Sequence, residues 1–435
     1  MRRTIGIEEK LSFWETLPLS FQHLMAMFGS TVLVPLLFHI NPAIALLMNG
    51  IGTLLYTFIT KGGIPSYLGS SFAFIAPTLL IMSQSSYSHA QSGFIFFGIF
   101  FVLVSFIISA VGTRWIDICL PAPVMGAVVA VIGLELAPVA AQMAGLLAPS
   151  AAVGQVVQAF QPDPNVIMVS MFTLLVGIFG SVIFRGFLQI IPILIAIIAG
   201  YVLALFKGMV DFTPVAQAAW IKMPSFSAPV FDVNAILIIA PAALVVLAEH
   251  VGHLIVTGNI VEKDLIKKPG LHLSLLADGI SNMISGFTGS PPNTTYGENI
   301  GVMAITRVYS VWVIRGAAIL AIIISCFGKF AAAIQTIPTP VMGGISILLF
   351  GVIAAAGIRM LVEQKVNYSK NYNMMLSAVV FIIGVSGASI KLGAFELKGM
   401  ALAAAVGIVL ALVLHMLKVC GLLNDDLDET KASSK

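Results

Sequence analysis

The chain has 435 residues, of which 59% are hydrophobic and 9% are charged, and its mean hydropathy is +1.03. This composition excludes a soluble globular protein, and the net charge of +3 is too small and too scattered for nucleic-acid binding. The apolar runs are continuous rather than alternating, which favours transmembrane helices over a β-barrel. Three widely separated cysteines, Cys119, Cys326 and Cys420, form no metal or redox motif.

Residues 1–20 are polar enough to predict a cytoplasmic N-terminus. The segment lacks the small-residue cleavage site that is typical of a removed signal peptide. The apolar runs that follow predict an all-α integral membrane protein with about fourteen transmembrane segments. These begin near Phe21, Ala43, Ser70, Gly93, Val124, Val166, Leu188, Val233, Leu271, Thr294, Val308, Val341, Met374 and Gly399. The third and tenth are too short to cross as ordinary helices. Residues 421–435 form a polar tail that we expect to be disordered and cytoplasmic.

The distribution of Lys and Arg tests this map, because cytoplasmic loops carry an excess of both. With the N-terminus inside, sixteen of the 22 lie in inside segments, and five, Lys207, Lys222, Lys329, Lys391 and Lys398, lie outside. The remaining one, Arg315, falls within span eleven, near enough to the inner face to snorkel. The bias supports an even number of spans and two cytoplasmic termini.

An internal repeat divides the chain. Leu120-Pro-Ala-Pro-Val-Met-Gly126 opens span five, and Ile337-Pro-Thr-Pro-Val-Met-Gly343 opens span twelve. The alternative is coincidence in a chain rich in Pro, Gly and Val. Because the copies lie seven spans apart, they enter the membrane from opposite sides, as in the inverted repeats of secondary transporters.

The two short segments correspond in this repeat. Span three carries Ser66-Tyr-Leu-Gly-Ser-Ser-Phe-Ala-Phe-Ile-Ala-Pro77, and span ten follows Gly289-Ser-Pro-Pro-Asn293. Pro and Gly interrupt both as helices. Paired, interrupted segments indicate a substrate site near the middle of the membrane, where broken backbone exposes N–H and C=O groups to a ligand.

Two carboxylates lie in apolar surroundings, Glu249 in span eight and Glu298 in span ten. A carboxylate at this depth costs a few kcal/mol unless it is protonated, paired or beside a wet cavity, so both are candidates for function. The alternative is a structural acid hydrogen-bonded between helices. His253 is four residues after Glu249 and shares its helical face, which suits either proton sharing or a helix-stabilising pair.

Other polar and aromatic residues lie in or next to these spans. His250 points about 100° away from Glu249 and is interpreted as a structural histidine. His23 either supports the site at a distance or is structural, and Asp278 is interpreted as a helix-packing group with a place beside the site as the alternative. Tyr296 and Phe72 suit stacking on a flat ring, although packing is the commoner role. Asn299 brings an amide next to Glu298.

A metal enzyme and a channel are the two other classes of protein that the sequence brings into question. The run Glu249-His-Val-Gly-His253 has the wrong order for the zinc motif His-Glu-x-x-His, and no third ligand cluster is apparent, so a metal enzyme is not expected. A channel is compatible with broken helices and an inverted repeat, but titratable carboxylates favour a coupled carrier. We expect no cofactor, only a co-transported proton.

The run Glu298-Asn-Ile-Gly-Val-Met-Ala-Ile-Thr-Arg307 is similar to the signature of the nucleobase–ascorbate transporter family (nucleobase:cation symporter-2), which is Gln/Glu/Pro, Asn, any residue, Gly, four residues, Thr, then Arg/Lys/Gly. The resemblance extends through Glu249-His-Val-Gly-His253, Gly69-Ser-Ser-Phe-Ala-Phe74 and the doubled Pro-x-Pro-Val-Met-Gly to the whole chain up to the polar tail. Glu in the first signature position resembles the uracil branch of the family, whereas purine carriers usually have Gln there.

The resemblance implies a uracil:proton symporter of the bacterial inner membrane that dimerises through its gate domain. It implies two inverted sevens of spans, with a short strand opening spans three and ten and the two strands pairing antiparallel. The implied divisions are an N-terminus (1–20), a core domain in two halves (21–110 and 233–328), a gate domain in two halves (111–232 and 329–420) and a tail (421–435).

Carried over by motif, the side chains of Glu249 and Glu298 would hydrogen-bond uracil, and the backbone at Phe72 and Gly297 would contact its carbonyl groups. Glu249 and His253 would couple the proton. The expected supporting residues are Tyr296, Ser71, His23 and Asn299. A xanthine or urate carrier of the same family, or an anion exchanger or channel of the same architecture, remains the alternative.

Overall fold

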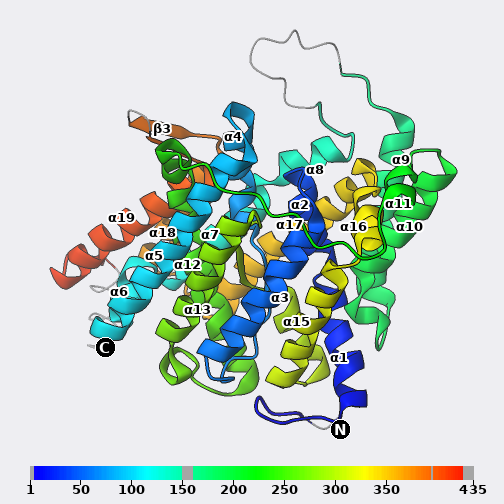
Figure 1. The fold of residues 1–435 in the computed structure, drawn as a ribbon. Helices are drawn as coiled ribbons and strands as arrows, with labels where there is room; N and C mark the ends of the chain where they lie inside the picture. Colours follow the sequence, from blue (N-terminus) through cyan, green and yellow to red (C-terminus); the bar gives the residue numbers. More distant parts are fainter. Residues whose placement is uncertain (1–3, 149–159, 393–394, 425–435) are drawn as a thin grey trace.

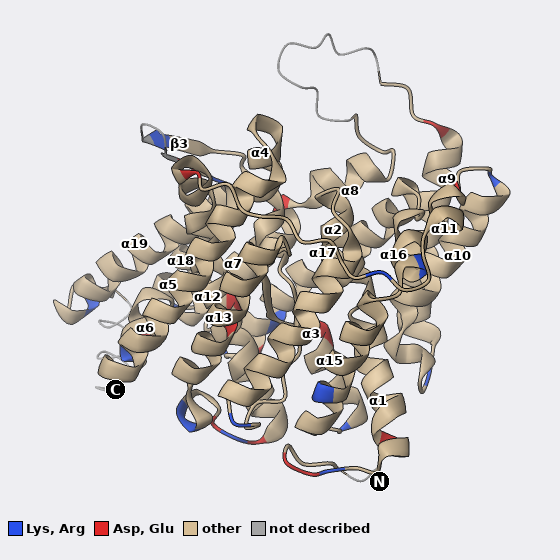
Figure 2. Ribbon diagram, viewed as in Figure 1, with Lys and Arg blue, Asp and Glu red and all other residues tan. Residues whose placement is uncertain are grey.

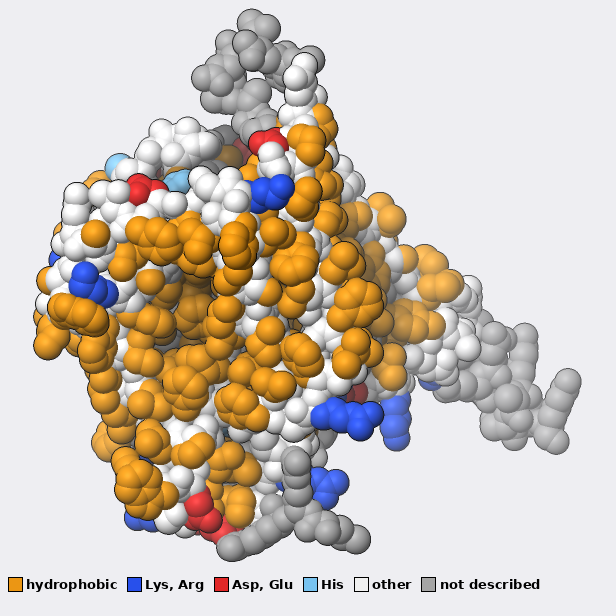
Figure 3. All heavy atoms as spheres, turned by 90° about the vertical axis from the view of Figure 1, so that its right-hand side faces the viewer, with side chains coloured by type: hydrophobic (Ala, Val, Ile, Leu, Met, Phe, Trp, Pro, Cys, Tyr) orange, Lys and Arg blue, Asp and Glu red, His pale blue; other side chains and the backbone are white. Residues whose placement is uncertain are grey.

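The computed structural model describes residues 4–148, 160–392 and 395–424, and most of them are helical, as predicted (Figure 1). Within these residues, eight helices are long and apolar enough to cross a membrane, and four shorter apolar helices accompany them. The exposed side chains are apolar across a broad band, and most charged side chains lie towards the two edges of that band (Figure 3). The protein is therefore a multi-pass membrane protein. The count of fourteen spans stays a prediction, and most of the expected tail lies outside the described residues.

Polar caps set the start of several helices, because the first N–H groups of a helix lack partners within it. Asn41 accepts from Ala43 N at 2.9 Å at the start of one long helix, and Asp232 accepts from Asn234 N at 2.9 Å at the start of another. At the N-terminus, Ser12 and Glu15 form a capping box. The first helix consequently begins at Phe13, which is just over two turns before Phe21, where the first span was expected to begin.

The long helices pack in two sets. The first set is α1 (Phe13–Ala26), α3 (Pro42–Ile59), α5 (Tyr87–Val111), α12 (Val233–Val261), α13 (Leu271–Thr288) and α15 (Val311–Ser325). The second is α7 (Ala122–Glu135), α9 (Pro164–Ile183), α10 (Pro192–Phe206), α17 (Thr339–Glu363), α18 (Asn371–Val385) and α19 (Gly399–Val419). Helix α12 contacts both sets, through α5 on one side and α7 and α19 on the other.

Short helices complete the described chain. They are α2 (Phe28–Leu37), η1 (Phe72–Phe74), α4 (Ile75–Gln84), α6 (Arg114–Cys119), α8 (Ala137–Met143), η2 (Leu188–Ile190), α11 (Thr213–Gln217), η3 (Ile266–Gly270), α14 (Gly297–Thr306) and α16 (Gly328–Gln335). Helices α4 and α14 have ten residues each, so neither crosses a bilayer alone, as expected for the third and tenth segments.

Glycines allow close helix packing inside each set. A Cβ on Gly98 of α5 would lie 2.6 Å from the carbonyl oxygen of Gly279 on α13. In the second set, a Cβ on Gly357 of α17 would lie 2.6 Å from the carbonyl oxygen of Gly126 on α7. Small residues of this kind let membrane helices approach backbone to backbone, where packing and not the hydrophobic effect holds them together.

Two small antiparallel sheets interrupt the helices. The strand β1 (Leu68–Ser70) pairs with β2 (Asn293–Thr295), with Gly69 opposite Thr294, which confirms the expected pairing. The hairpin of β3 (Ser389–Leu392) and β4 (Phe395–Lys398) was not predicted. Each strand is short, and Lys391 and Glu396 form an ion pair of 3.4 Å at the molecular surface. In the sequence, such a short segment with exposed charges does not differ from a polar loop.

Candidate functional site

The site is built around two half-helices that start at the β1–β2 pair. Strand β1 leads through Ser71 into η1 and α4, and β2 leads through Tyr296 into α14. The strands run antiparallel, so the two helices leave in opposite directions with their N-terminal ends beside the sheet. Neither Ser71 nor Tyr296 caps its helix with a side chain. The backbone N–H groups and the positive ends of both helix dipoles therefore face the same region.

A cavity of about 300 Å³ adjoins this sheet, between the two sets of helices. Seven predicted site residues line it: Ser71, Phe72, Glu249, His253, Tyr296, Gly297 and Glu298. The cavity follows α12 from Glu249 to Ile260, a length of about 16 Å at the helical rise. Its remaining walls are mostly apolar and come largely from α14 and α17, which is the usual character of a small-molecule site with a few fixed polar groups.

Helix α12 presents Glu249 and His253 to this cavity from one face, as their spacing predicts. Among the described residues, Oε2 of Glu249 has no hydrogen-bond partner. His253 Nδ1 lies 2.9 Å from the carbonyl oxygen of Thr295, which can only accept. The hydrogen of neutral His253 is thus on Nδ1, and Nε2 is left as the acceptor, 3.3 Å from where a Cβ of Gly297 would lie.

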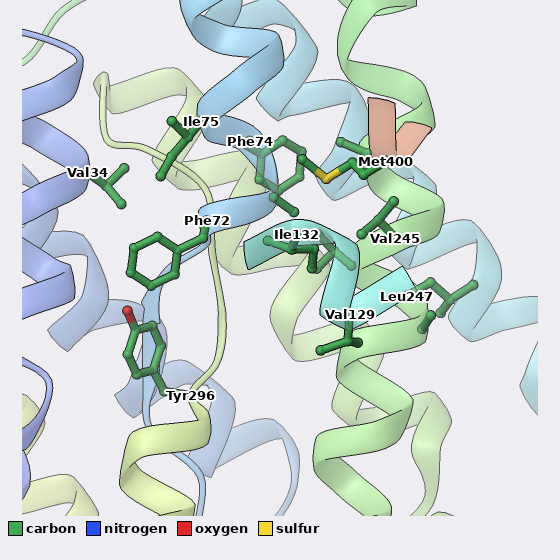
Figure 4. Packing of buried hydrophobic residues seen from close by; sticks show 14 of the residues in the cluster. Val34, Phe72, Phe74, Ile75, Val129, Ile132, Val245, Leu247, Tyr296 and Met400 are labelled. Atoms are coloured by element: carbon green, nitrogen blue, oxygen red, sulfur yellow. The ribbon is translucent and has the colours of Figure 1, made fainter. Parts of the chain in front are cut away.

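Aromatic rings form one wall of the site. The rings of Phe72 and Tyr296 lie next to each other, with centroids 6.4 Å apart and planes tilted by 39° (Figure 4). Phe72 also makes a T-shaped contact with Phe350 on α17, with ring centroids 5.9 Å apart. Gly69 lies directly under the Tyr296 ring, where any side chain would collide with it. The contact between Gly69 on β1 and the Tyr296 ring after β2 therefore ties the position of the aromatic wall to the pairing of the two strands.

Two predicted supporting residues do not line the cavity. Asn299 Nδ2 donates to His23 Nδ1 at 3.0 Å and to the His23 carbonyl oxygen at 3.3 Å. Both side chains are buried, and the contact ties α14 to α1. His23 and Asn299 are thus brought together with each other, behind the half-helix, rather than with the ligand-facing groups.

A buried polar network holds β2 in place, and the sequence indicated only part of it. His250 Nδ1 lies 2.9 Å from Asp278 Oδ2, with both side chains fully buried. Thr294 donates to the same carboxylate at 3.0 Å, and Asn282 donates to its other oxygen at 2.9 Å. Asn282 also accepts from the Asn293 backbone N–H at 2.7 Å. His250 and Asp278 therefore have the structural role favoured from the sequence, and that role extends to positioning the strand.

A charged pair stands at the end of the cavity that is remote from the sheet. Arg359 Nε donates to Glu363 Oε1 at 2.7 Å, and both residues line the cavity. This pair was not predicted from the sequence, although its i,i+4 spacing on one helix is typical of an ion pair. No group of three or more His, Cys, Asp and Glu side chains suitable for a metal ion occurs among the described residues.

Two interrupted half-helices around a cavity with paired carboxylates define a membrane transporter. The sequence matches the model of the Permease family over residues 14–393, and the chain belongs to that family. It is 60% identical over 415 residues to a uracil permease of Paenibacillus larvae, covering 95% of this chain and 97% of that protein. It is 61% identical over 418 residues to a uracil permease of Escherichia coli K12, covering 96% and 95%. The predicted nucleobase–cation symporter family is confirmed.

The uracil permease of Bacillus subtilis is a more distant relative, 44% identical over 422 residues, with 95% of this chain and 96% of that protein covered. Solved structures show the same fold at low identity. The transmembrane domain of a cyanobacterial bicarbonate transporter, BicA, has a TM-score of 0.64 at 14% identity, covering 93% of this chain and all of that one. The transporter SLC26A9 has a TM-score of 0.69 at 13% identity, covering 93% and 65%.

Proposed function

We propose that this protein is a proton-coupled symporter that carries uracil across the bacterial inner membrane by alternating access. One observation carries the proposal: a cavity lined by two carboxylates and by two half-helix N-termini whose backbone lacks side-chain caps. The relatives at 60% and 61% identity over nearly the full length are named uracil permeases, which supports uracil as the substrate.

The polar groups of the cavity complement a pyrimidine ring. Uracil presents two N–H donors and two C=O acceptors on one flat ring. Glu249 and Glu298 offer carboxylate oxygens that accept, and the backbone N–H groups at Phe72 and Gly297 offer donors. The Phe72 and Tyr296 side chains supply an apolar wall against which the ring packs. The alternation of donors and acceptors is thus available without a positive side chain next to the sheet, which an anionic substrate would need. The arginine that lines the cavity, Arg359, lies at its remote end and is paired with Glu363.

Proton coupling is assigned to Glu249 with His253 beside it. An ionised carboxylate only accepts hydrogen bonds, whereas a protonated one also donates. Protonation of Glu249 changes the hydrogen-bond pattern that uracil meets and reduces the repulsion between two negative charges in one apolar cavity. Binding of the proton and of uracil are then linked, and each strengthens the other by the same factor.

The eight long apolar helices and the four shorter ones, together with α13 and α14, give the fourteen crossings of the proposed topology. The paired half-helices support an inverted repeat, and the two sets of helices support core and gate domains that move relative to each other. With both termini in the cytoplasm, Ile260, Arg359 and Glu363 lie at inner helix ends, so the cavity opens inward. Dimerisation through the gate domain is part of the same proposal.

Binding and uptake by the purified protein test the substrate and the coupling together. Radiolabelled uracil should bind, with xanthine, thymine and ascorbate as competitors, and proteoliposomes should accumulate it when the outside is made acidic. Stronger competition by xanthine than by unlabelled uracil would reassign the substrate. Accumulation that is insensitive to a protonophore would show that uptake is not coupled to protons.

A separate variant tests the site. Glu298→Ala should weaken uracil binding about 10- to 100-fold, since a hydrogen bond to a charged group contributes about 1.5–3 kcal/mol. Glu363→Ala, at the far end of the same cavity, is the matched control and should bind uracil as the wild type does. Normal affinity in Glu298→Ala would take Glu298 out of the site.

A further inference from the structure

Arg315 is a cation on a membrane-spanning helix to which the transport site gives no role. It lies on the second turn of α15, where Nε donates to Thr57 Oγ1 at 3.1 Å and Nη2 donates to the Thr57 carbonyl oxygen at 3.3 Å. The guanidinium also lies 4.7 Å from the centre of the Trp312 ring. Among the described residues, no carboxylate forms an ion pair with it. A charge at this position is costly unless an anion or water offsets it.

The guanidinium stands at one end of a groove on the outer surface of the helices. This groove has a volume of about 520 Å³ and lies between α3 and α15. It is lined by Ile51, Leu54, Leu55, Thr57, Phe58 and Arg315. Phe58 is 78% exposed, as expected for a side chain that faces lipid. Apart from Thr57 and Arg315, the walls are apolar, so the groove suits a hydrocarbon chain with a polar head at the arginine.

A second cation comes from the segment that precedes the first helix. Lys10 Nζ lies 4.3 Å from the centre of the same Trp312 ring, so the two positive groups are no farther apart than the sum of their distances to it. The segment is held beside α15, since Val311 N donates to the Ile7 carbonyl oxygen at 2.9 Å and Ser310 Oγ donates to the Glu9 carbonyl oxygen at 2.6 Å. The positive charge is therefore built into the fold at this place.

The remaining hydrogen-bonding capacity of Arg315 specifies the partner. A guanidinium has five N–H donors in a planar fork, and Thr57 accepts from only two of its nitrogens. The donors that Thr57 does not engage suit an anion with several oxygens, and phosphate is the anion that combines this shape with an attached hydrocarbon chain in a bilayer. We propose that Arg315 and Lys10 bind the phosphate of an anionic phospholipid whose acyl chain occupies the groove between α3 and α15.

A purely structural role for Arg315 makes a different prediction. Thr57 lies in the last turn of α3, where a cation stabilises the carbonyl end of a helix. That role accounts for the Thr57 contacts, but it requires neither Lys10 nor the groove. The two roles are separated by measuring lipid preference and thermal stability on the same variants.

Native mass spectrometry of the delipidated transporter supplies the lipid measurement. Phosphatidylglycerol and phosphatidylcholine with identical acyl chains are titrated separately. The wild type should bind the first phosphatidylglycerol about tenfold or more tightly than phosphatidylcholine, and Arg315→Gln should abolish this preference, because a charged hydrogen-bonded pair is lost. Arg185→Gln is the matched control, since it removes one exposed arginine that does not line the groove. It should retain the preference.

A second variant keeps the proposal testable if Arg315→Gln does not fold. Leu55→Trp fills the groove, leaves both cations in place, and changes a half-buried side chain that lines it. It should weaken phosphatidylglycerol binding as well. Unchanged lipid preference in both variants would overturn the proposal, as would a lower melting temperature in Arg315→Gln with the preference intact. Displacement of phosphatidylglycerol by excess inorganic phosphate would indicate a free-anion site and would also overturn it.

Discussion

Replacing Glu249 by Gln is the sharpest test of the proposed coupling. The amide has nearly the shape of the carboxyl group but cannot take up a proton. In the wild type, Oε2 of Glu249 has no hydrogen-bond partner among the described residues and the side chain borders the cavity, so the substitution breaks no hydrogen bond of that oxygen. Any change in uracil binding therefore reports on the ligand and the proton rather than on folding.

The magnitude follows from linkage. If uracil binds with the uptake of one proton, its Kd rises with pH, up to about tenfold per pH unit, over the range in which that proton is released, since one unit corresponds to 1.36 kcal/mol per proton. Over two pH units of that range the wild type should therefore lose affinity by up to about 100-fold. Glu249→Gln removes the group that carries the proton, so its Kd should be nearly flat.

Isothermal calorimetry or scintillation proximity binding at four pH values measures the slope, and His253→Gln is the matched variant on the same helical face. His253→Gln should bind more weakly overall, because the hydrogen bond from Nδ1 to Thr295 is lost, but it should keep the slope. Equal slopes in wild type and Glu249→Gln would refute the assignment. A flat profile in His253→Gln alone would move the proton to the histidine.

Substitutions at three further positions test the scaffold of the site. Gly297→Ala places a Cβ 3.3 Å from His253 Nε2, so we expect about tenfold weaker uracil binding at an unchanged melting temperature, measured by calorimetry and thermal unfolding. Gly69→Ala drives a Cβ into the Tyr296 ring, which should lower both affinity and melting temperature, and a loss of neither would argue against the close contact. Asp278→Ala removes one partner of a fully buried pair, which costs about 3–5 kcal/mol. Little folded protein should remain, whereas Asp278→Asn should retain more.

The repeat motif and the punctuation of the apolar runs were sufficient to predict the broken third and tenth segments, because Pro and Gly at these positions prevent a continuous helix whatever surrounds them. The start of α1 was missed, since Ser12 and Glu15 cap a helix from within a segment that hydropathy alone describes as polar. Most charged residues lie towards the two ends of the helices, and a few lie midway along them (Figure 2). The placement at the ends follows from the continuous apolar runs of the sequence, which leave the charges to the loops.

Positions of side chains around the cavity were predictable only where a local rule fixes them. The i,i+4 spacing places Glu249 and His253 on one face of α12. No such rule relates Asn299 to His23, which are 276 residues apart in the sequence, and their contact with each other depends on how α14 packs on α1. The network around Asp278 is similar, because it joins α12, α13 and β2, and only the tertiary arrangement brings Asn282 and Thr294 to one carboxylate.

The assignment of the proton to Glu249 rather than His253 rests on what each residue already binds. The hydrogen on Nδ1 of His253 is directed at the Thr295 carbonyl oxygen, so a second proton would have to be added at Nε2. That nitrogen faces the first residue of α14, Gly297, where the positive end of the helix dipole opposes another positive charge. Glu249 shares the cavity with Glu298, and its protonation removes one of two like charges. Uracil uptake by His253→Gln should accordingly remain driven by an acidic exterior, and uptake that no longer responds to the pH gradient would show that the imidazole is the carrier.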